Sequence, residues 1–162
     1  MDKQARLEFF WRMYLSSFPE GQEPPSRSYE PWIFGDNQEL ADKLADLVCR
    51  GIKTATSSLL WEYETKREEL PQVGQLAVVT DWDGEPRCVI EITEVEVRPF
   101  NGVDEQFVID YGEGDRSLTW WHSAMWEYYT VECQRLGREP SRDMPLVCLR
   151  FRLLFPESVI PA

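Results

Sequence analysis

The stretch "CRGIKTATSSLLW", residues 49–61, places one lysine beside a run of small hydroxyl residues. Lys53 and Thr56 are the pair there whose side chains could do chemistry. In a partly buried pocket, desolvation favours the neutral lysine amine, and a neutral amine can take the proton of a neighbouring hydroxyl. In a regular strand, residues three apart point to opposite faces, so the two meet only if the backbone turns or kinks. Spacing alone therefore favours a surface lysine.

A second group of charged residues, Glu113, Asp115 and Arg116, precedes a helical pattern that begins near residue 117. Acidic residues at a helix N-terminus are usually capping groups that interact with the helix dipole. The functional alternative is a carboxylate at the edge of a cleft, beside backbone N–H groups of residues 114–117 that can bind an anion. The pattern by itself favours the capping role.

Several aromatic side chains could stack on nucleic acid bases, although such residues more often belong to a core. The candidates are Trp61, Tyr63, Trp82, Trp120 and Trp121. Trp120 and Trp121 are adjacent on a predicted helix and cannot share one face, so one of them is expected to be exposed or to line a groove. The single histidine, His122, lies in the middle of this helix among aromatic residues. We expect it to be packed or at the surface, and not a catalyst.

Helical periodicity predicts the elements that must position these residues. An apolar stripe from Leu7 to Phe18 predicts an N-terminal helix, and the proline-rich segment 19–31 predicts a loop after it. Residues 35–51 have a cap signal at Asp36 or Asn37 and a glycine at the end, which predicts a second helix. Further helices are predicted at 61–70 and at 117–137, the latter capped by Ser117 or Asp115.

Strand signals follow mostly in the second half of the chain. Strands are predicted at 75–82, 87–97 and 145–155, with a "DGEP" turn joining the first two, and 54–60 is predicted to be strand-like or irregular. The alternation in 87–97 predicts one buried face and one charged face toward water, and 100–115 is predicted to be a loop with one short helical turn. Antiparallel strands between helices indicate an α+β fold with a small curved sheet or open barrel. We expect residues 31–156 to form the main domain and residues 1–30 to pack on it.

The charge balance limits the partners. The net charge is −12, from 17 basic and 29 acidic residues, so the chain is a poor candidate for coating duplex DNA or an anionic membrane. A nucleoside or a short single strand in a local pocket remains compatible with it. The four cysteines are far apart, which gives no zinc site. We expect neither a signal peptide nor a membrane span, and therefore reduced thiols and a cytoplasmic protein.

Taken together, these blocks resemble the ASCH domain family, whose barrel fold is similar to the RNA-binding PUA domain. The resemblance rests on "GIKTAT" after a helix, a β-hairpin, "EGDRSLTWW" opening a helix, and a closing strand. It extends from about Phe34 to Phe155 and is similar to a longer subgroup with an extra N-terminal helix. The resemblance implies a link to RNA. Some members are described as amidohydrolases acting on acetylated cytidine, and others as metal-assisted ribonucleases on single-stranded RNA.

The resemblance also implies site residues. The lysine, threonine and glutamate of the amidohydrolase members match Lys53, Thr56 and Glu113, although the loop around residues 100–115 differs in length. Lys53 would act as a base, Thr56 as the nucleophile and Glu113 as the group that orients the amine or shuttles its proton. The expected substrate-binding residues are Ser57, Tyr63, Trp82, Arg116, Ser117 and Trp120.

Three functional hypotheses follow from the resemblance. The first is a hydrolase for a modified nucleoside, the second is a single-stranded ribonuclease using the same cleft, and the third is a non-catalytic RNA-binding module. No cofactor is expected, except a divalent metal ion if the protein is a ribonuclease. The expected partners are a nucleoside or short single-stranded RNA, with the protein a monomer or a homodimer.

Overall fold

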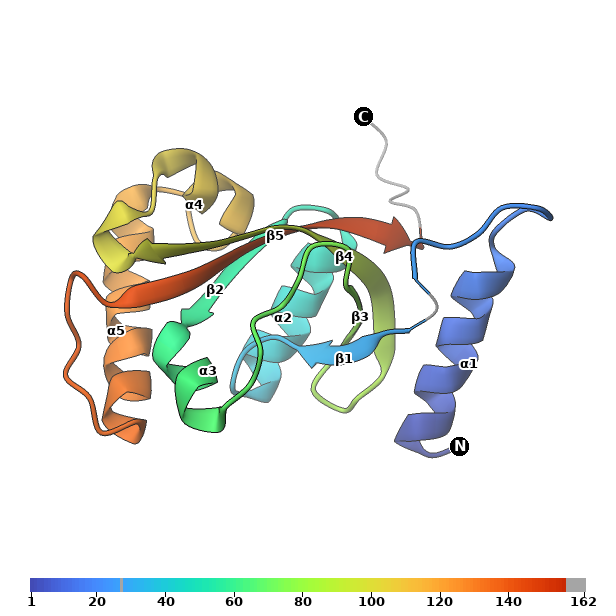
Figure 1. The fold of residues 1–162 in the computed structure, drawn as a ribbon, viewed down its shortest axis with the longest axis horizontal. Helices are drawn as coiled ribbons and strands as arrows, with labels where there is room; N and C mark the ends of the chain where they lie inside the picture. The colour runs from blue at the N-terminus through green and yellow to red at the C-terminus, as the bar shows by residue number, and fades with distance from the viewer. Residues whose placement is uncertain (27, 157–162) are drawn as a thin grey trace. The chain divides into compact units, whose positions relative to one another are not determined.

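The computed structural model describes residues 1–26 and 28–156, in which one mixed sheet has five strands and five α-helices accompany it. In sheet order the strands are β1 (Glu30–Ile33), β3 (Leu76–Thr80), β4 (Pro86–Pro99), β5 (Pro145–Phe155) and β2 (Ala55–Leu59). The helices are α1 (Lys3–Ser16), α2 (Gln38–Cys49), α3 (Leu60–Lys66), α4 (Glu105–Tyr111) and α5 (Leu118–Arg135), with a 3-10 turn η1 (Phe100–Gly102). The expected α+β class is confirmed, and the sheet is mixed (Figure 1).

The chain divides into two compact units. The first contains residues 1–52 and 73–93 and the described residues from Phe151 onward, and the second contains residues 53–72 and 94–150. In the first unit, β1 runs parallel to β3, and β3 is antiparallel to β4. In the second unit, β2 is antiparallel to β5, with Ala55 opposite Arg150. The long strands β4 and β5 each contribute residues to both units.

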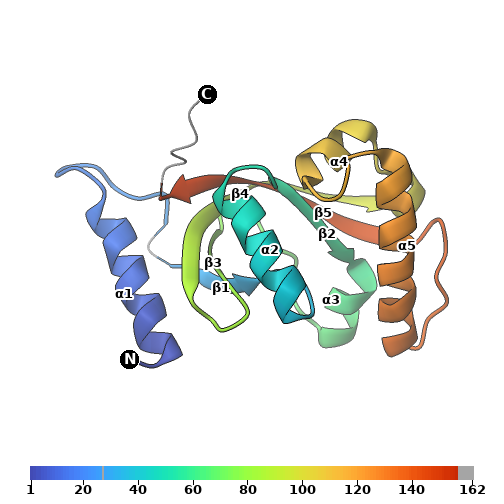
Figure 2. The same ribbon diagram turned by 180° about the vertical axis from the view of Figure 1, so that it is seen from behind.

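In the first unit, helices cover both faces of β3 and β4. Ala77, Val79, Cys88 and Ile90 pack with α2, whereas the alternate residues of these strands, among them Val78, pack with α1. Both ribbon views show β3 and β4 between α1 and α2 (Figures 1 and 2). The prediction that β4 buries only one face is therefore wrong for residues 88–90, all of which are fully buried. The N-terminal helix supplies the second cover, through Leu7, Trp11 and Tyr14.

The second unit is built around an aromatic core under β2 and β5. Phe100, Phe107, Tyr111, Trp121 and Tyr129 are each at most 3% exposed. The Phe100 and Trp121 rings stack with centroids 5.3 Å apart, and Tyr111 meets Trp121 edge-on at 5.9 Å. Two helices, α4 and α5, supply most of these rings, so this core fixes the helix ends that lead into the loop at residues 112–117.

Two predictions of secondary structure are wrong. Segment 100–115 is not a loop with a single turn, because α4 occupies Glu105–Tyr111 and is capped by the Asp104 carboxylate. The predicted loop 19–31, of which residue 27 lies outside the described residues, ends in the first two residues of β1, a strand that the sequence pattern did not indicate. β1 pairs with β3 in parallel, a pairing for which the sequence pattern made no prediction. Within the described residues, no helix is long and apolar enough to cross a membrane.

Candidate functional site around Lys53

Lys53 follows the turn that ends α2. Gly51 has φ of +72°, the left-handed conformation that glycine adopts without strain, and the chain leaves α2 there as predicted. Thr54 then donates its backbone N–H to the Asp110 carbonyl at 2.7 Å, and β2 begins at Ala55. The segment that carries Lys53 is therefore held against the C-terminal end of α4.

The Lys53 ammonium is surrounded by three acceptors. Nζ donates to the Ala55 carbonyl at 2.7 Å, the Tyr111 carbonyl at 3.2 Å and Glu113 Oε2 at 2.7 Å. It also lies 3.5 Å from the centroid of the Tyr111 ring, a cation–π contact. The Lys53 side chain is 0% exposed and that of Glu113 is 15% exposed, so water reaches this ion pair only from the glutamate side. The expectation of a surface lysine, based on spacing alone, is wrong.

Burial lowers the pKa of Lys53, while the negative charge of Glu113 and its hydrogen bond oppose that shift. The desolvation cost applies to the charged form, so a buried ammonium loses its proton more readily than a surface one. Glu113 keeps the amine oriented in either state, because its oxygen lies within hydrogen-bond distance of Nζ. The site thus joins an amine that can become a base with a carboxylate that can exchange protons with it.

Hydroxyl groups gather at the other end of the Tyr111 ring. Ser57 Oγ lies 3.3 Å from the Tyr111 hydroxyl and 2.5 Å from the Tyr129 hydroxyl. Burial raises the pKa of Tyr111, and hydrogen bonds from Ser57 and Thr56 to it oppose that effect. Burial also raises the pKa of Tyr129, so both phenols stay protonated at neutral pH. Tyr111 therefore interacts with both Lys53 and Thr56, a role that no motif or spacing in the sequence indicated.

The loop after α4 presents Glu113 to Lys53. Gly114 has φ of +61°, and a Cβ there would lie 2.2 Å from the Trp120 ring, so only glycine allows the loop to pack on that ring. Arg116 also adopts a left-handed conformation, with φ of +62°. Ser117 caps α5 by accepting the Trp120 N–H at 3.0 Å, as one of the two predicted caps. The loop is thus fixed at both ends, by α4 and by α5.

Two of the backbone N–H groups that the sequence suggested for anion binding are already engaged within this loop. The Arg116 N–H donates to the Glu113 carbonyl at 3.3 Å, and the Ser117 N–H donates to Asp115 Oδ1 at 2.8 Å. An oxyanion at this site would need other donors. The Arg116 and Ser117 N–H groups are therefore not free for this role.

The remaining predicted substrate-binding residues are dispersed. Tyr63, on α3, accepts a hydrogen bond from Ser58 Oγ at 3.3 Å, and Arg116 is exposed. Trp120 is half-buried over Gly114. Trp82 belongs to the first unit, where it is 41% exposed and its backbone N–H donates to Asp42 Oδ1. It is not among the residues that the second unit brings together around Lys53.

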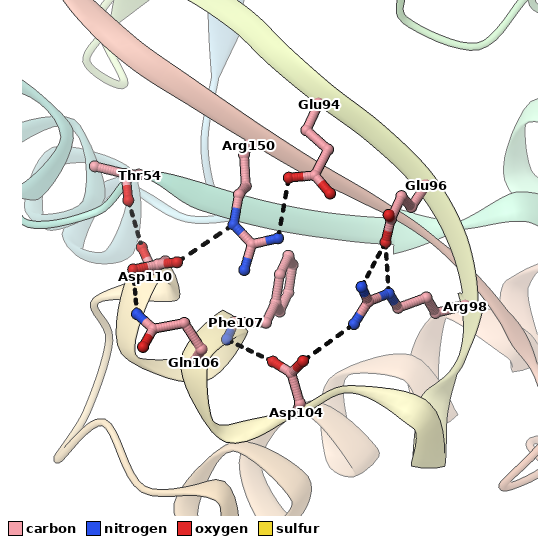
Figure 3. Close-up of polar contacts among 9 residues, drawn as sticks. All are labelled: Thr54, Glu94, Glu96, Arg98, Asp104, Gln106, Phe107, Asp110 and Arg150. Atoms are coloured by element: carbon pink, nitrogen blue, oxygen red, sulfur yellow. Dashed lines mark hydrogen bonds and ion pairs between the residues drawn. The ribbon is translucent and has the colours of Figure 1, made fainter.

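An arginine–carboxylate network fastens α4 at both ends (Figure 3). At the C-terminal end, Arg150 pairs with Asp110 at 3.3 Å and with Glu94 at 3.2 Å. At the N-terminal end, Arg98 pairs with Asp104 at 3.4 Å and with Glu96. The charges of β4 at residues 94–98 therefore do more than face water, because they hold the helix that carries Tyr111. Alternating charges at the end of a strand were the only sequence signal for this arrangement.

Comparisons with known proteins agree with this architecture. The ASCH domain family model matches residues 30–154. The crystal structure of an ASCH domain from Lactobacillus crispatus JV V101 is 42% identical, with a TM-score of 0.86, and the match covers 92% of this chain and 94% of that one. A crystal structure of a protein from Enterococcus faecalis V583 is 31% identical, with a TM-score of 0.80, covering 93% of this chain and 89% of that one.

A third solved structure, of a hypothetical protein, shows likeness in fold alone. It is 13% identical with a TM-score of 0.51, and the match covers 78% of this chain and 98% of that one. No curated protein matches the chain. The family match over most of the chain and the two identities above 30% lead to one conclusion: the chain belongs to the ASCH domain family.

Proposed function

We propose that the protein hydrolyses the amide of a modified nucleoside, of the acetylated cytidine type, through Lys53, Thr56 and Glu113. The observation that carries this proposal is the buried Lys53–Glu113 pair, with Nζ 2.7 Å from Oε2 and over the Tyr111 ring, whose hydroxyl interacts with Thr56. The ASCH domain family is generally associated with RNA binding, which supports a nucleoside as the substrate class.

The first half of the proposed reaction transfers the acetyl group to the protein. Thr56 Oγ attacks the acetyl carbon, and its proton passes to the neutral Lys53 amine. The carbon–nitrogen bond then breaks as Lys53 returns this proton to the departing cytidine nitrogen. Cytidine leaves, and an acetyl ester remains on Thr56.

The second half restores the protein. Water attacks the ester carbon and gives its proton to Lys53, which passes it to Thr56 Oγ as the acetate leaves. Glu113 keeps the Lys53 amine oriented through both halves of the reaction. It also offers a route by which a proton on Lys53 can pass to solvent. The lowered pKa of Lys53 supports this role, because a base is useful only if its neutral form is populated.

One observation favours a second candidate, a non-catalytic RNA-binding module. Lys53 already donates all three ammonium protons, two of them to carbonyl groups of the backbone. A cation at the C-terminal end of α4 is also a common stabilising feature of helices. In this alternative, Lys53 and Glu113 form a structural ion pair, and the site recognises RNA without changing it.

The test is a panel of acylated nucleosides and short single-stranded RNAs, incubated with wild type, Lys53→Met, Thr56→Val and the control Ser58→Ala. Ser58 lies on the same strand as Thr56 but bonds to Tyr63. We expect acetate release from acetylated cytidine, abolished in the first two variants and retained in the control. Absence of turnover with every acylated nucleoside would contradict the proposal. Salt-sensitive RNA binding without product would then support the binding module, and cleavage of RNA would support a ribonuclease.

A further inference from the structure

A separate cavity of about 530 Å³ lies along the first turns of α5, and its lining combines aromatic, hydroxyl and cationic groups. It is lined by Leu118, Thr119, His122, Ser123, Trp126 and Arg142. All six residues belong to the second unit. None of them belongs to the Lys53 site described above.

The helix contributes two parallel rows to this cavity. Residues four apart lie on the same side of a helix, so Leu118, His122 and Trp126 form an apolar and aromatic row. Thr119 and Ser123 form a neighbouring row of hydroxyl groups. An aromatic row beside a hydroxyl row matches a ligand that has a flat ring at one end and hydrogen-bond acceptors at the other.

Arg142 places a positive charge over these rows. Its guanidinium carbon lies 4.3 Å from the centroid of the Trp126 ring and 5.7 Å from that of Phe100. Across the described residues it forms no ion pair with a carboxylate, unlike Arg98 and Arg150. A guanidinium that lies over an aromatic ring can still donate its N–H groups to an anion, and arginine matches phosphate oxygens well. This charge stands out in a chain with a net charge of −12.

The backbone fixes the position of Arg142. Its carbonyl accepts the Asn101 N–H at 3.0 Å, and the Met144 carbonyl accepts the Phe100 N–H at 2.9 Å. His122 packs its ring 5.2 Å from that of Phe100. Burial lowers the pKa of His122, with a further contribution from the charge of Arg142. At neutral pH, the Arg142 guanidinium therefore lies beside a neutral His122 imidazole. This half of the cavity is preformed, because contacts within the protein hold both groups.

We propose that this cavity binds a nucleotide, with its phosphate on Arg142 and the hydroxyl groups of Thr119 and Ser123, and its base against the aromatic row. Bases stack on aromatic rings and on guanidinium planes, and both surfaces are present here. The proposal does not depend on amide hydrolysis at Lys53, because it uses none of the residues of that site.

The same loop provides a matched control. Arg138 also stacks on a tryptophan, with its guanidinium 4.5 Å from the Trp61 ring centroid, but it does not line the cavity. Arg142→Gln and Arg138→Gln therefore remove the same charge from exposed arginines of one loop. Only the first removes it from the cavity.

The experiment follows the Trp126 indole N–H by NMR in the full chain while cytidine monophosphate, cytidine or inorganic phosphate is added. We expect cytidine monophosphate to shift this signal and to bind more tightly than either fragment. Arg142→Gln should weaken binding roughly tenfold or more, since a charge-assisted hydrogen bond is lost, and Arg138→Gln should change it less than about twofold.

Three outcomes would overturn the proposal: no shift of the Trp126 signal, equal losses in the two arginine variants, or inorganic phosphate binding as tightly as the nucleotide. If Lys53→Met loses acetate release, nucleotide binding at the cavity should remain unchanged. Failure of the proposed nucleotide site and failure of the proposed hydrolase are thus distinguishable.

Discussion

Lys53 and Arg150 each pair with carboxylates close to α4, but in different surroundings. The Lys53 side chain is 0% exposed, whereas that of Arg150 is 24% exposed. The oxygen–nitrogen distances differ by only about half an ångström, from 2.7 Å at Lys53 to 3.2 and 3.3 Å at Arg150. The nitrogen–oxygen distance therefore does not distinguish an ion pair in a candidate reactive site from one with a structural role, whereas burial of the cation does.

The physical reason is the cost of desolvation. Exposed ion pairs contribute roughly 0–1 kcal/mol, because water already solvates both charges well. A buried pair gains little net stability when intact, but removing one partner leaves an uncompensated charge, which costs roughly 3–5 kcal/mol. The same cost makes the neutral form of a buried amine accessible, whereas an arginine such as Arg150 stays charged.

The largest expected effect on stability comes from breaking the buried pair. Glu113→Ala should lower the free energy of unfolding by roughly 3–5 kcal/mol, because the buried Lys53 ammonium would lose the carboxylate that lies 2.7 Å from it. Glu94→Ala, which removes a partner of Arg150, should cost roughly 0–1 kcal/mol. Urea unfolding measures both values. Equal losses in the two variants would show that burial does not distinguish the pairs.

A second prediction concerns pH. The folded-state pKa of Lys53 is lowered, so the unfolded chain binds more protons than the folded one at pH values between that pKa and about 10.4. Stability should therefore rise with pH in this window through Lys53, and fall as the pH drops through the folded-state pKa. Urea unfolding of wild type and Lys53→Met up to pH 9.5 isolates this contribution. A difference between the two proteins that does not change with pH would contradict the prediction.

Activity should follow the same group. If Lys53 is the base, kcat/KM for acetylated cytidine should increase with pH and reach a plateau above the pKa of Lys53. Arg150→Met should leave the position of this rise unchanged or move it only slightly, because the substitution loosens α4 without removing the amine. A kcat/KM that falls as the pH rises would count against Lys53 as the base.

A smaller effect is expected at Tyr111. Tyr111→Phe keeps the ring beneath Lys53 but removes the hydroxyl that interacts with Ser57 and Thr56. We expect kcat for acetylated cytidine to fall roughly tenfold, about the value of one hydrogen bond, with KM changed less. Tyr128→Phe is the control, since Tyr128 lies on the exposed side of the same helix as Tyr129. Equal activities of Tyr111→Phe and Tyr128→Phe would show that the Tyr111 hydroxyl has no role in the reaction.

Much of the fold followed from the sequence because its elements are long or strongly patterned. The final strand was predicted at 145–155, the residues that β5 occupies, and the N-terminal helix followed from its apolar stripe. The strand β1 was missed because its four residues carry too little periodicity, and α4 was predicted only as a single helical turn within a loop. The parallel pairing of β1 with β3 joins segments about 47 residues apart, a distance that a local pattern cannot register.

The candidate site was less accessible to prediction. Residue types and spacing favoured a surface lysine, and only the resemblance to the ASCH family raised Lys53, Thr56 and Glu113 to a common site. Tyr111, which contacts Lys53 and interacts with Thr56, is 58 residues from Lys53 in the chain. The burial that distinguishes this lysine also arises from distant segments, chiefly α4 and the loop after it. Neither the contacts of Tyr111 nor the burial of Lys53 can therefore be inferred from the residues next to Lys53 in the sequence.

The most direct test of the central claim is a single-turnover reaction with protein in excess over acetylated cytidine, quenched at increasing times and examined by mass spectrometry. The proposed mechanism predicts that cytidine forms before acetate, and that one acetyl group is transiently bound to the peptide containing Thr56. Thr56→Val should show neither event. Acetate release in step with cytidine, with no acetyl group on Thr56 at any time, would contradict the account.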